Sequence, residues 1–187
     1  MRYLLAFFII CAGSLVQAAP AEYRLEPDRS IVGFEVDFEN TVISGNMPVS
    51  QADLTLDFDS VAASKVRVTL NPDRAQMDMP FATMAMKGRT VLNTRAHPTI
   101  RFESTSARKN GPGAIIEGLV TIRGVTRPVT LNGQVYRQPG TEPGERDRLS
   151  ILLTGAVSRS AFGASGWPDL VGDEVRLRIL ARIRRLD

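Results

Sequence analysis

The side chains that most often carry catalysis are sparse in this sequence. His97 is the one histidine in 187 residues, and Pro98 follows it directly. A lone histidine without a second ligand at metal-binding spacing is a weak site signal, and a residue before proline is typical of an element boundary. The one cysteine, Cys11, lies in an apolar run at the N-terminus. The sequence therefore offers neither a metal-ligand set nor a cysteine–histidine pair.

Carboxylates are the remaining candidates for chemistry. Glu35, Asp37, Glu103 and Glu117 lie in segments of alternating hydrophobicity, and a pair of them could perform acid–base catalysis as in glycosidases. The competing interpretation is a solvated outer face, which we favour because surface carboxylates far outnumber catalytic ones. The short motifs of zinc proteases, serine hydrolases and phosphate-binding loops do not occur, and residues 163–166 (GASG) have the wrong spacing for a nucleophile elbow. We expect no catalytic residue, no metal site and no cofactor.

The first 18 residues have the pattern of a signal peptide. Arg2 precedes a short apolar stretch, and the small residues Val16 and Ala18 stand at the third and first positions before a cut after Ala18. The stretch is too short for a comfortable membrane span. We therefore expect residues 1–18 to be removed and residues 19–187 to form one domain, placed in the periplasm or secreted.

Removal of the leader changes the composition of the chain. Cleavage takes 18 of 187 residues and leaves 169, without a cysteine, and loss of Arg2 lowers the formal net charge from +3 to +2. A chain of this length with 43% hydrophobic residues can form a core without disulfides. The sequence contains no basic block, so nucleic acid is not an expected partner.

Alternating apolar and polar residues run along most of the mature chain. In residues 30–38, Phe34, Val36 and Phe38 fall on one side, and Glu35 and Asp37 fall on the other. This period of two predicts a strand with one dry face. The same alternation recurs at Leu54, Leu56 and Phe58; Val66, Val68 and Leu70; Ile100 and Phe102; residues 115–122; Val129, Leu131 and Val135; Ile151, Leu153 and Val157; and Val175, Leu177, Ile179 and Ile183.

One segment breaks the period. In residues 80–92, the apolar spacing fits a helix whose Phe81, Met84 and Leu92 turn inward, with Pro80 near its start and Asp78 as a candidate cap. Many short strands with turn residues between them predict either a closed barrel or a packed sandwich. A barrel of about eight antiparallel strands removes sheet edges and can hold one small ligand, but alternation alone does not separate it from a sandwich.

Five sequence segments, in order along the chain, resemble the YceI-like family. These are residues 23–30 (YRLEPDRS), 97–104 (HPTIRFES), 118–131 (GLVTIRGVTRPVTL), 159–163 (RSAFG) and 171–175 (VGDEV). Within the third segment, Arg123-Gly124 allows a hairpin turn between two alternating strands. The resemblance implies an all-β fold, an extended, eight-stranded antiparallel lipocalin-like barrel with one short helix near its mouth. It also implies a periplasmic or secreted protein that binds a polyisoprenoid, a quinone-like tail or another long-chain lipid.

Apolar bulk on the predicted dry faces fits such a ligand as well as it fits an ordinary core. The residues we predict to line the cavity are Phe34, Val36, Phe38, Leu54, Leu56, Phe81, Met84, Phe102, Phe162 and Trp167. Arg159 is expected to pair with a carboxylate near the barrel rim. Transient membrane contact and a homodimer remain open.

Three functions remain as alternatives. The first is a binding protein for transport, storage or sequestration of the lipid, and this is the one we expect. The second is a stress-related, partner-binding protein with a filled core, and the third is an enzyme that uses strand carboxylates.

Overall fold

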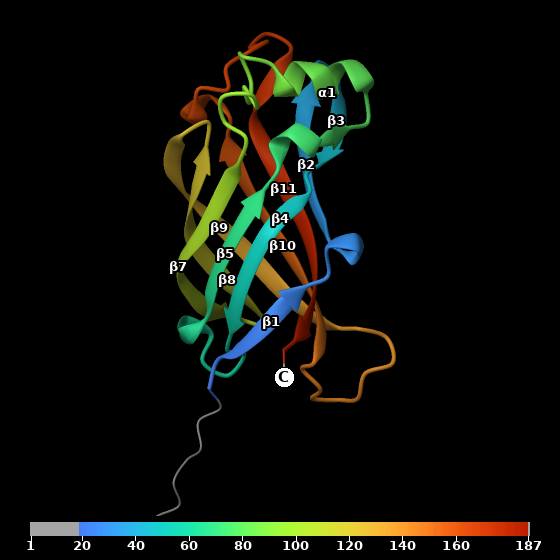
Figure 1. The fold of residues 1–187 in the computed structure, drawn as a ribbon, viewed down its shortest axis with the longest axis vertical. Coiled ribbons are helices and arrows are strands. Elements are labelled where there is room, and N and C mark those ends of the chain that lie inside the picture. The colour runs from blue at the N-terminus through green and yellow to red at the C-terminus, as the bar shows by residue number, and fades with distance from the viewer. Residues whose placement is uncertain (1–18, 187) are drawn as a thin grey trace, which may run out of the picture.

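A computed structural model of the chain describes residues 19–186 and shows a tall antiparallel barrel with one α-helix among these residues at its upper end (Figure 1). The predicted leader, residues 1–18, lies outside the described residues. The strands are β1 (Ala21–Leu25), β2 (Ile31–Phe38), β3 (Thr41–Asn46), β4 (Val49–Leu56), β5 (Lys65–Leu70), β6 (Gln76–Met77), β7 (Ile100–Asn110), β8 (Gly113–Ile122), β9 (Val125–Arg137), β10 (Arg148–Ser158) and β11 (Val171–Arg185). The helix is α1 (Pro80–Lys87), and the short 3-10 turns are Pro27–Arg29, Val61–Ala63, Pro72–Arg74 and Ser160–Phe162.

Eight of the strands close on themselves. Their order is β1-β4-β5-β7-β8-β9-β10-β11, and β11 pairs back with β1. Closure confirms the predicted barrel and decides against the sandwich, because a sandwich keeps two separate sheets.

The longest strand, β11, serves two partners. Near its C-terminal end it pairs with β1, where Ile183 lies opposite Leu25. Nearer its start it pairs with β2, where Leu177 lies opposite Phe34. Strands β3 and β6 continue the sheet from β2, so the upper half of the barrel has an extended wall beneath α1.

The turn between β8 and β9 confirms the predicted hairpin. Ile122 lies opposite Val125 in the register, and Arg123 and Gly124 between them both have positive φ, 53° and 77°. Two positive φ values in a two-residue loop match the twist of the flanking strands, and glycine adopts this conformation without a Cβ penalty.

The helix is shorter than the sequence predicts. It ends at Lys87, because Gly88 takes an extended conformation and donates its N–H back to the Ala85 carbonyl. Leu92 therefore lies in the following loop, where its N–H bonds the Met86 carbonyl. The predicted cap is also wrong: Met79 occupies the N-cap position without a side-chain cap bond, while a carboxylate oxygen of Asp78 accepts from the Ser44 backbone N–H at 3.1 Å.

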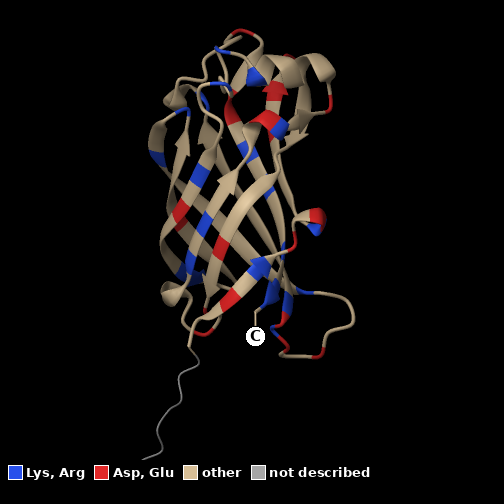
Figure 2. Cartoon of the chain, viewed as in Figure 1, with Lys and Arg blue, Asp and Glu red and all other residues tan. Residues whose placement is uncertain are grey.

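Buried side chains form a lining rather than a solid centre. One cluster is centred on Leu131 and Phe162, a second on Leu54 and Ile183, and a third on Val36 and Ile43; the first and third both include a residue of α1, Met86 and Ala82. Charged residues of both signs are spread along the strands (Figure 2). Within residues 19–186, no helix is both long enough and apolar enough to cross a bilayer.

Candidate functional site

The interior of the barrel is a cavity of about 900 Å³. Ligand pockets usually measure about 300–1,000 Å³, so this volume is near the upper end of the range. The cavity extends from Phe81 and Trp167, at the end that carries α1, to Lys109 and Arg146 at the opposite end. Its wall combines inward residues of all eight barrel strands with α1, and nearly all of those residues are apolar. A space of this kind is suited to a long hydrocarbon chain.

Nine of the ten predicted lining residues lie on the cavity wall. They are Phe34, Val36, Phe38, Leu54, Leu56, Phe81, Phe102, Phe162 and Trp167. The strand residues among them face inward because of the period-two alternation that predicted them. Contact between these residues and a bound ligand remains a prediction.

Met84 is the exception, and its predicted direction is wrong. Its side chain is 77% exposed and does not line the cavity. Helix α1 has apolar residues on two faces, and the inner face is the one that carries Ala82 and Met86, both buried. Phe81 lies at the margin between these faces, since it lines the cavity and is also 58% exposed.

Two aromatic residues of the wall rest on cross-strand glycines. Phe34 lies opposite Gly45, and a Cβ built on Gly45 would overlap the Phe34 ring. Gly118 lies opposite Ser104, diagonally across from Phe102, and a Cβ built on it would overlap the Phe102 ring. A Cβ at either glycine would also meet a backbone carbonyl, that of Gln76 or of Glu103, so neither position has room for a larger residue.

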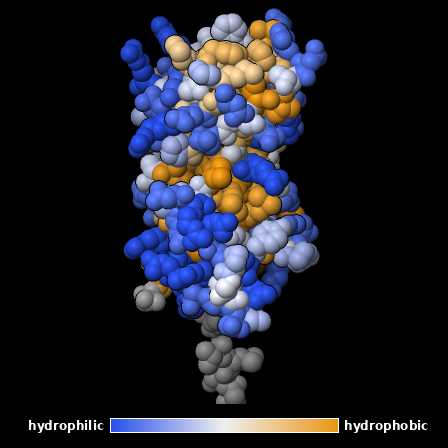
Figure 3. Space-filling model, turned by 90° about the vertical axis from the view of Figure 1, so that its right-hand side faces the viewer, coloured by the Kyte–Doolittle hydropathy of each residue, from blue (hydrophilic) through white to orange (hydrophobic). Residues whose placement is uncertain are grey.

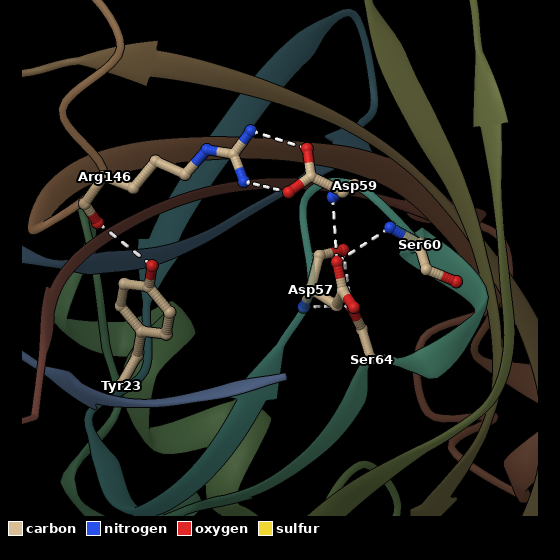
Figure 4. A network of polar contacts seen from close by, with 6 residues as sticks. All are labelled: Tyr23, Asp57, Asp59, Ser60, Ser64 and Arg146. Carbon is tan, nitrogen blue, oxygen red and sulfur yellow. Dashed lines mark hydrogen bonds and ion pairs between the residues drawn. The ribbon is translucent and has the colours of Figure 1, made fainter. Parts of the chain in front are cut away.

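A polar network ties the lower end of the barrel together (Figure 4). Arg146, in the loop between β9 and β10, donates to both carboxylate oxygens of Asp59 at 2.8 Å. The guanidinium also lies 5.9 Å from the ring centroid of Phe58, and the Tyr23 hydroxyl donates to the Arg146 carbonyl at 3.0 Å. Neighbouring Asp57, which is buried, accepts from the backbone N–H groups of Asp59 and Ser60. The loop is thereby held across the lower end of the cavity.

The ionisation of this network favours a persistent ion pair. The hydrogen bond from Arg146 lowers the pKa of the Asp59 carboxyl, and the same bond raises the pKa of Arg146. Burial raises the pKa of the Tyr23 hydroxyl, because desolvation disfavours the phenolate. Each of these shifts favours the bonded, structural form of the group rather than a form prepared for proton transfer.

The prediction that Arg159 pairs with a carboxylate is wrong. It is buried, and its guanidinium donates to four backbone carbonyls, those of Ala164, Gly166, Val171 and Gly172, at 2.7–2.8 Å. One arginine therefore organises the whole segment from residue 163 to residue 172. Asp173 is engaged separately: bonds from Ser158 and Ser160 lower the pKa of its carboxyl.

Of the strand carboxylates considered for catalysis, Asp37, Glu103 and Glu117 are exposed and Glu35 is half-buried. Arg176 bonds both carboxylate oxygens of Asp37, at 2.7 and 3.2 Å, and lies 3.9 Å from Glu35. The bond from Arg176 lowers the pKa of Asp37, which makes that carboxyl a poor general acid. Glu103 pairs with Arg67 on the surface. These contacts fit the solvated-face interpretation.

His97 lies outside the cavity wall. The His97 ring lies near Gly124 at the β8–β9 turn and does not line the cavity. Across residues 19–186, no group of three or more histidine, cysteine or acidic side chains is placed to hold a metal ion.

The cavity wall also contains residues that were not among the ten predicted. Some of them could have been predicted from the alternation, and others could not. Leu131, Ile151, Leu177 and Ile183 line the cavity, and the same alternation already placed each on a dry face. The polar lower end, with Lys109 and Arg146, gave no signal, because isolated charged residues next to turns are common on protein surfaces.

A family model described as the YceI-like domain matches residues 23–183, most of the chain. This chain belongs to the YceI-like family. A UPF0312 protein of Yersinia pestis is 30% identical to it over 161 residues, which cover 84% of this chain and 82% of the relative.

Solved structures extend the comparison to the fold of this YceI-like protein. Burkholderia cenocepacia BcnA matches with a TM-score of 0.76 at 18% identity, covering 85% of this chain and 99% of BcnA. A polyisoprenoid binding domain from Saccharophagus degradans matches with a TM-score of 0.61 at 9% identity, covering 89% of this chain and 99% of that domain. Identities this low show a shared fold alone.

Proposed function

We propose that this YceI-like protein is an exported, non-catalytic binding protein that holds one long-chain lipid of the polyisoprenoid class in its barrel. The main support for this proposal is the apolar cavity of about 900 Å³ that runs between the two ends of the barrel. Each buried methylene of a lipid chain contributes about 0.8 kcal/mol, so a long chain needs no charged anchor to bind. Family membership and the fold shared with a polyisoprenoid binding domain support this ligand class.

The quinone-like tail belongs to the same proposal. A quinone with an isoprenoid tail presents the same hydrocarbon chain as a polyisoprenoid, and the apolar wall makes no distinction between them. Transport, storage and sequestration all use the same bound state, and export beyond the cytoplasm rests on the leader pattern of residues 1–18.

The two other functions have weaker support. The partner-binding alternative assumes a filled core, whereas the buried clusters of this barrel surround a cavity. A carboxylate enzyme does not fit Glu35 and Asp37, which face Arg176 on the exposed surface rather than the cavity.

Organic extraction of protein purified from its native host, followed by mass spectrometry, tests the proposal. We expect a polyisoprenoid or quinone in a stoichiometry near one per chain. The matched control is the same protein unfolded and refolded without lipid. An extract from the native protein that contains no long-chain lipid above that control would overturn the proposal.

A further inference from the structure

Large apolar side chains are exposed together at the end of the barrel that carries α1. Phe81 and Met84 on the helix are 58% and 77% exposed, and Trp167 and Leu170 in the loop before β11 are 56% and 38% exposed. We call these four residues the mouth patch. Figure 3 views the side that carries α1, β2 and β3, and apolar side chains gather there at the upper end and again at mid-height. A surface helix normally presents polar residues to water, so this exposure requires an explanation.

The two halves of the mouth patch are joined. The Phe38 ring lies 6.2 Å from the Phe81 ring, and the N–H of the following residue, Glu39, donates to the Leu170 carbonyl at 2.8 Å. On the other side, the Gly166 N–H donates to the Thr90 carbonyl at 2.9 Å, which ties the Trp167 loop to the segment after α1. Helix and loop therefore form one end surface.

The mouth patch is continuous with the cavity. Phe81, Trp167 and Leu170 line the cavity and are also exposed to solvent. An apolar path thus leads from the barrel interior to the outer surface without crossing a polar rim at these residues.

The backbone holds Trp167 in place at a conformational cost. Its φ is +61°, in the left-handed region that is rare for large residues. The loop is fixed in this form by Arg159, which bonds the carbonyls of Gly166 and Val171 on either side of it. A strained residue that its surroundings over-determine suggests a functional constraint at that position.

We propose that the mouth patch inserts into the surface of a lipid bilayer and that the ligand passes between membrane and barrel there. This inference rests on the proposed function. Moving a long chain through water would cost about 0.8 kcal/mol for each methylene exposed. Direct contact between an apolar mouth and the membrane removes that barrier, and tryptophan is enriched where proteins meet the membrane interface.

A bilayer fits the mouth patch better than a second copy of the chain. Four partly exposed large side chains offer roughly 450 Å², less than the roughly 800 Å² that each partner contributes to a standard interface. Lys87 and Arg89, beside the outer face of α1, have no carboxylate within salt-bridge distance among residues 19–186. Asp169 and Glu39 lie at the same end, beside Leu170, so the choice of a bilayer rests on the apolar patch, and the two cations add a local attraction to anionic headgroups.

The chain contains a single tryptophan, so Trp167 reports on its own surroundings. Purified full-length mature protein is mixed with vesicles of phosphatidylethanolamine and a minority of phosphatidylglycerol. We expect a blue shift of the emission, and quenching when the vesicles contain brominated lipid. The double variant Phe81→Ser/Met84→Ser should partition into vesicles about tenfold more weakly, which corresponds to about 1.4 kcal/mol.

A matched double variant controls for surface hydrophobicity in general. Leu119 and Tyr136 on the barrel wall are 44% and 48% exposed, and Leu119→Ser/Tyr136→Ser should partition as the wild type does. Equal loss in both double variants would overturn the inference, and so would an unchanged Trp167 spectrum at saturating lipid. A blue shift without vesicles that grows with protein concentration would overturn it in favour of a second copy.

The failure of this inference differs from failure of the proposed function. Absence of lipid from the native extract would reject the binding protein itself. Lipid in the extract together with an unchanged Trp167 spectrum would reject only the docking surface. Quenching of the wild type by brominated lipid needs no variant, so the inference stays testable if a variant fails to fold.

Discussion

Substituting Ala181 by phenylalanine should block the cavity without unfolding the barrel. Ala181 lies on β11 opposite Ile151, and both line the cavity. A phenyl ring in this position displaces about four methylenes of a bound chain, which at about 0.8 kcal/mol each removes about 3 kcal/mol of binding free energy. We therefore expect Ala181→Phe to weaken lipid binding by about two orders of magnitude.

The same substitution separates a cavity from a filled core. If the space beside Ala181 is open, the new ring enters it, and the free energy of unfolding should change by less than about 1 kcal/mol. If the interior is filled, overpacking should lower that free energy by about 1–3 kcal/mol. The control is Ala156→Phe on β10, because Ala156 is exposed on the outer face opposite Arg176.

Two measurements on lipid-free protein decide the outcome. Displacement of a fluorescent polyene fatty acid by a polyisoprenol gives the affinity, and urea denaturation gives the free energy of unfolding. Wild-type affinity in Ala181→Phe would refute the placement of the ligand. If Ala181→Phe lowers the free energy of unfolding while Ala156→Phe does not, and the wild type shows no measurable lipid binding, the open cavity is refuted.

Three further predictions concern other contacts of the fold, and a fourth concerns the leader. Phe102→Gln places a polar group in the cavity wall and should lower co-purified lipid per mole of folded protein more than it lowers expression; equal losses would mean that Phe102 is merely core. Arg159→Met leaves four carbonyls without their donor and should lower the free energy of unfolding by about 3 kcal/mol, seen as a fall in Tm of about 6–12 °C, whereas an unchanged Tm would contradict the bonding described. The pKa of Asp59 is lowered in the folded state, so its pairing with Arg146 should stabilise the fold above the ordinary carboxyl pKa of about 4 and be lost as the pH falls through the lower folded value; NMR signals of the Arg146 guanidinium that change at neutral pH would disagree. Mass spectrometry of protein from the native host should give a chain that begins at Ala19, and an intact Met1 would disprove the predicted leader.

Most of the barrel could be predicted because its physical cause is local. Each wall strand has one dry face, so Val175 and Leu177 alternate with polar neighbours and point inward as their spacing requires. The hairpin at Gly124 was equally predictable, since its turn type depends on two adjacent residues. Barrel closure, in contrast, depends on β11 pairing back with β1, and alternation is the same in an open sheet.

The ends of the barrel could not be predicted in the same way. Helix α1 is apolar on two faces, and spacing alone does not say that Ala82 and Met86 face inward while Met84 faces solvent. The role of Arg159 depends on where the chain places four carbonyls after folding. A sequence pattern that suggests an ion pair contains no information about such a loop.

A crystal structure of protein purified from its host without delipidation tests the central claim most directly. The account predicts continuous, elongated density along the cavity, in contact with the rings of Phe34 and Phe102 and extending toward Trp167. It would be contradicted by side chains that close the interior, or by separate water molecules in place of a chain.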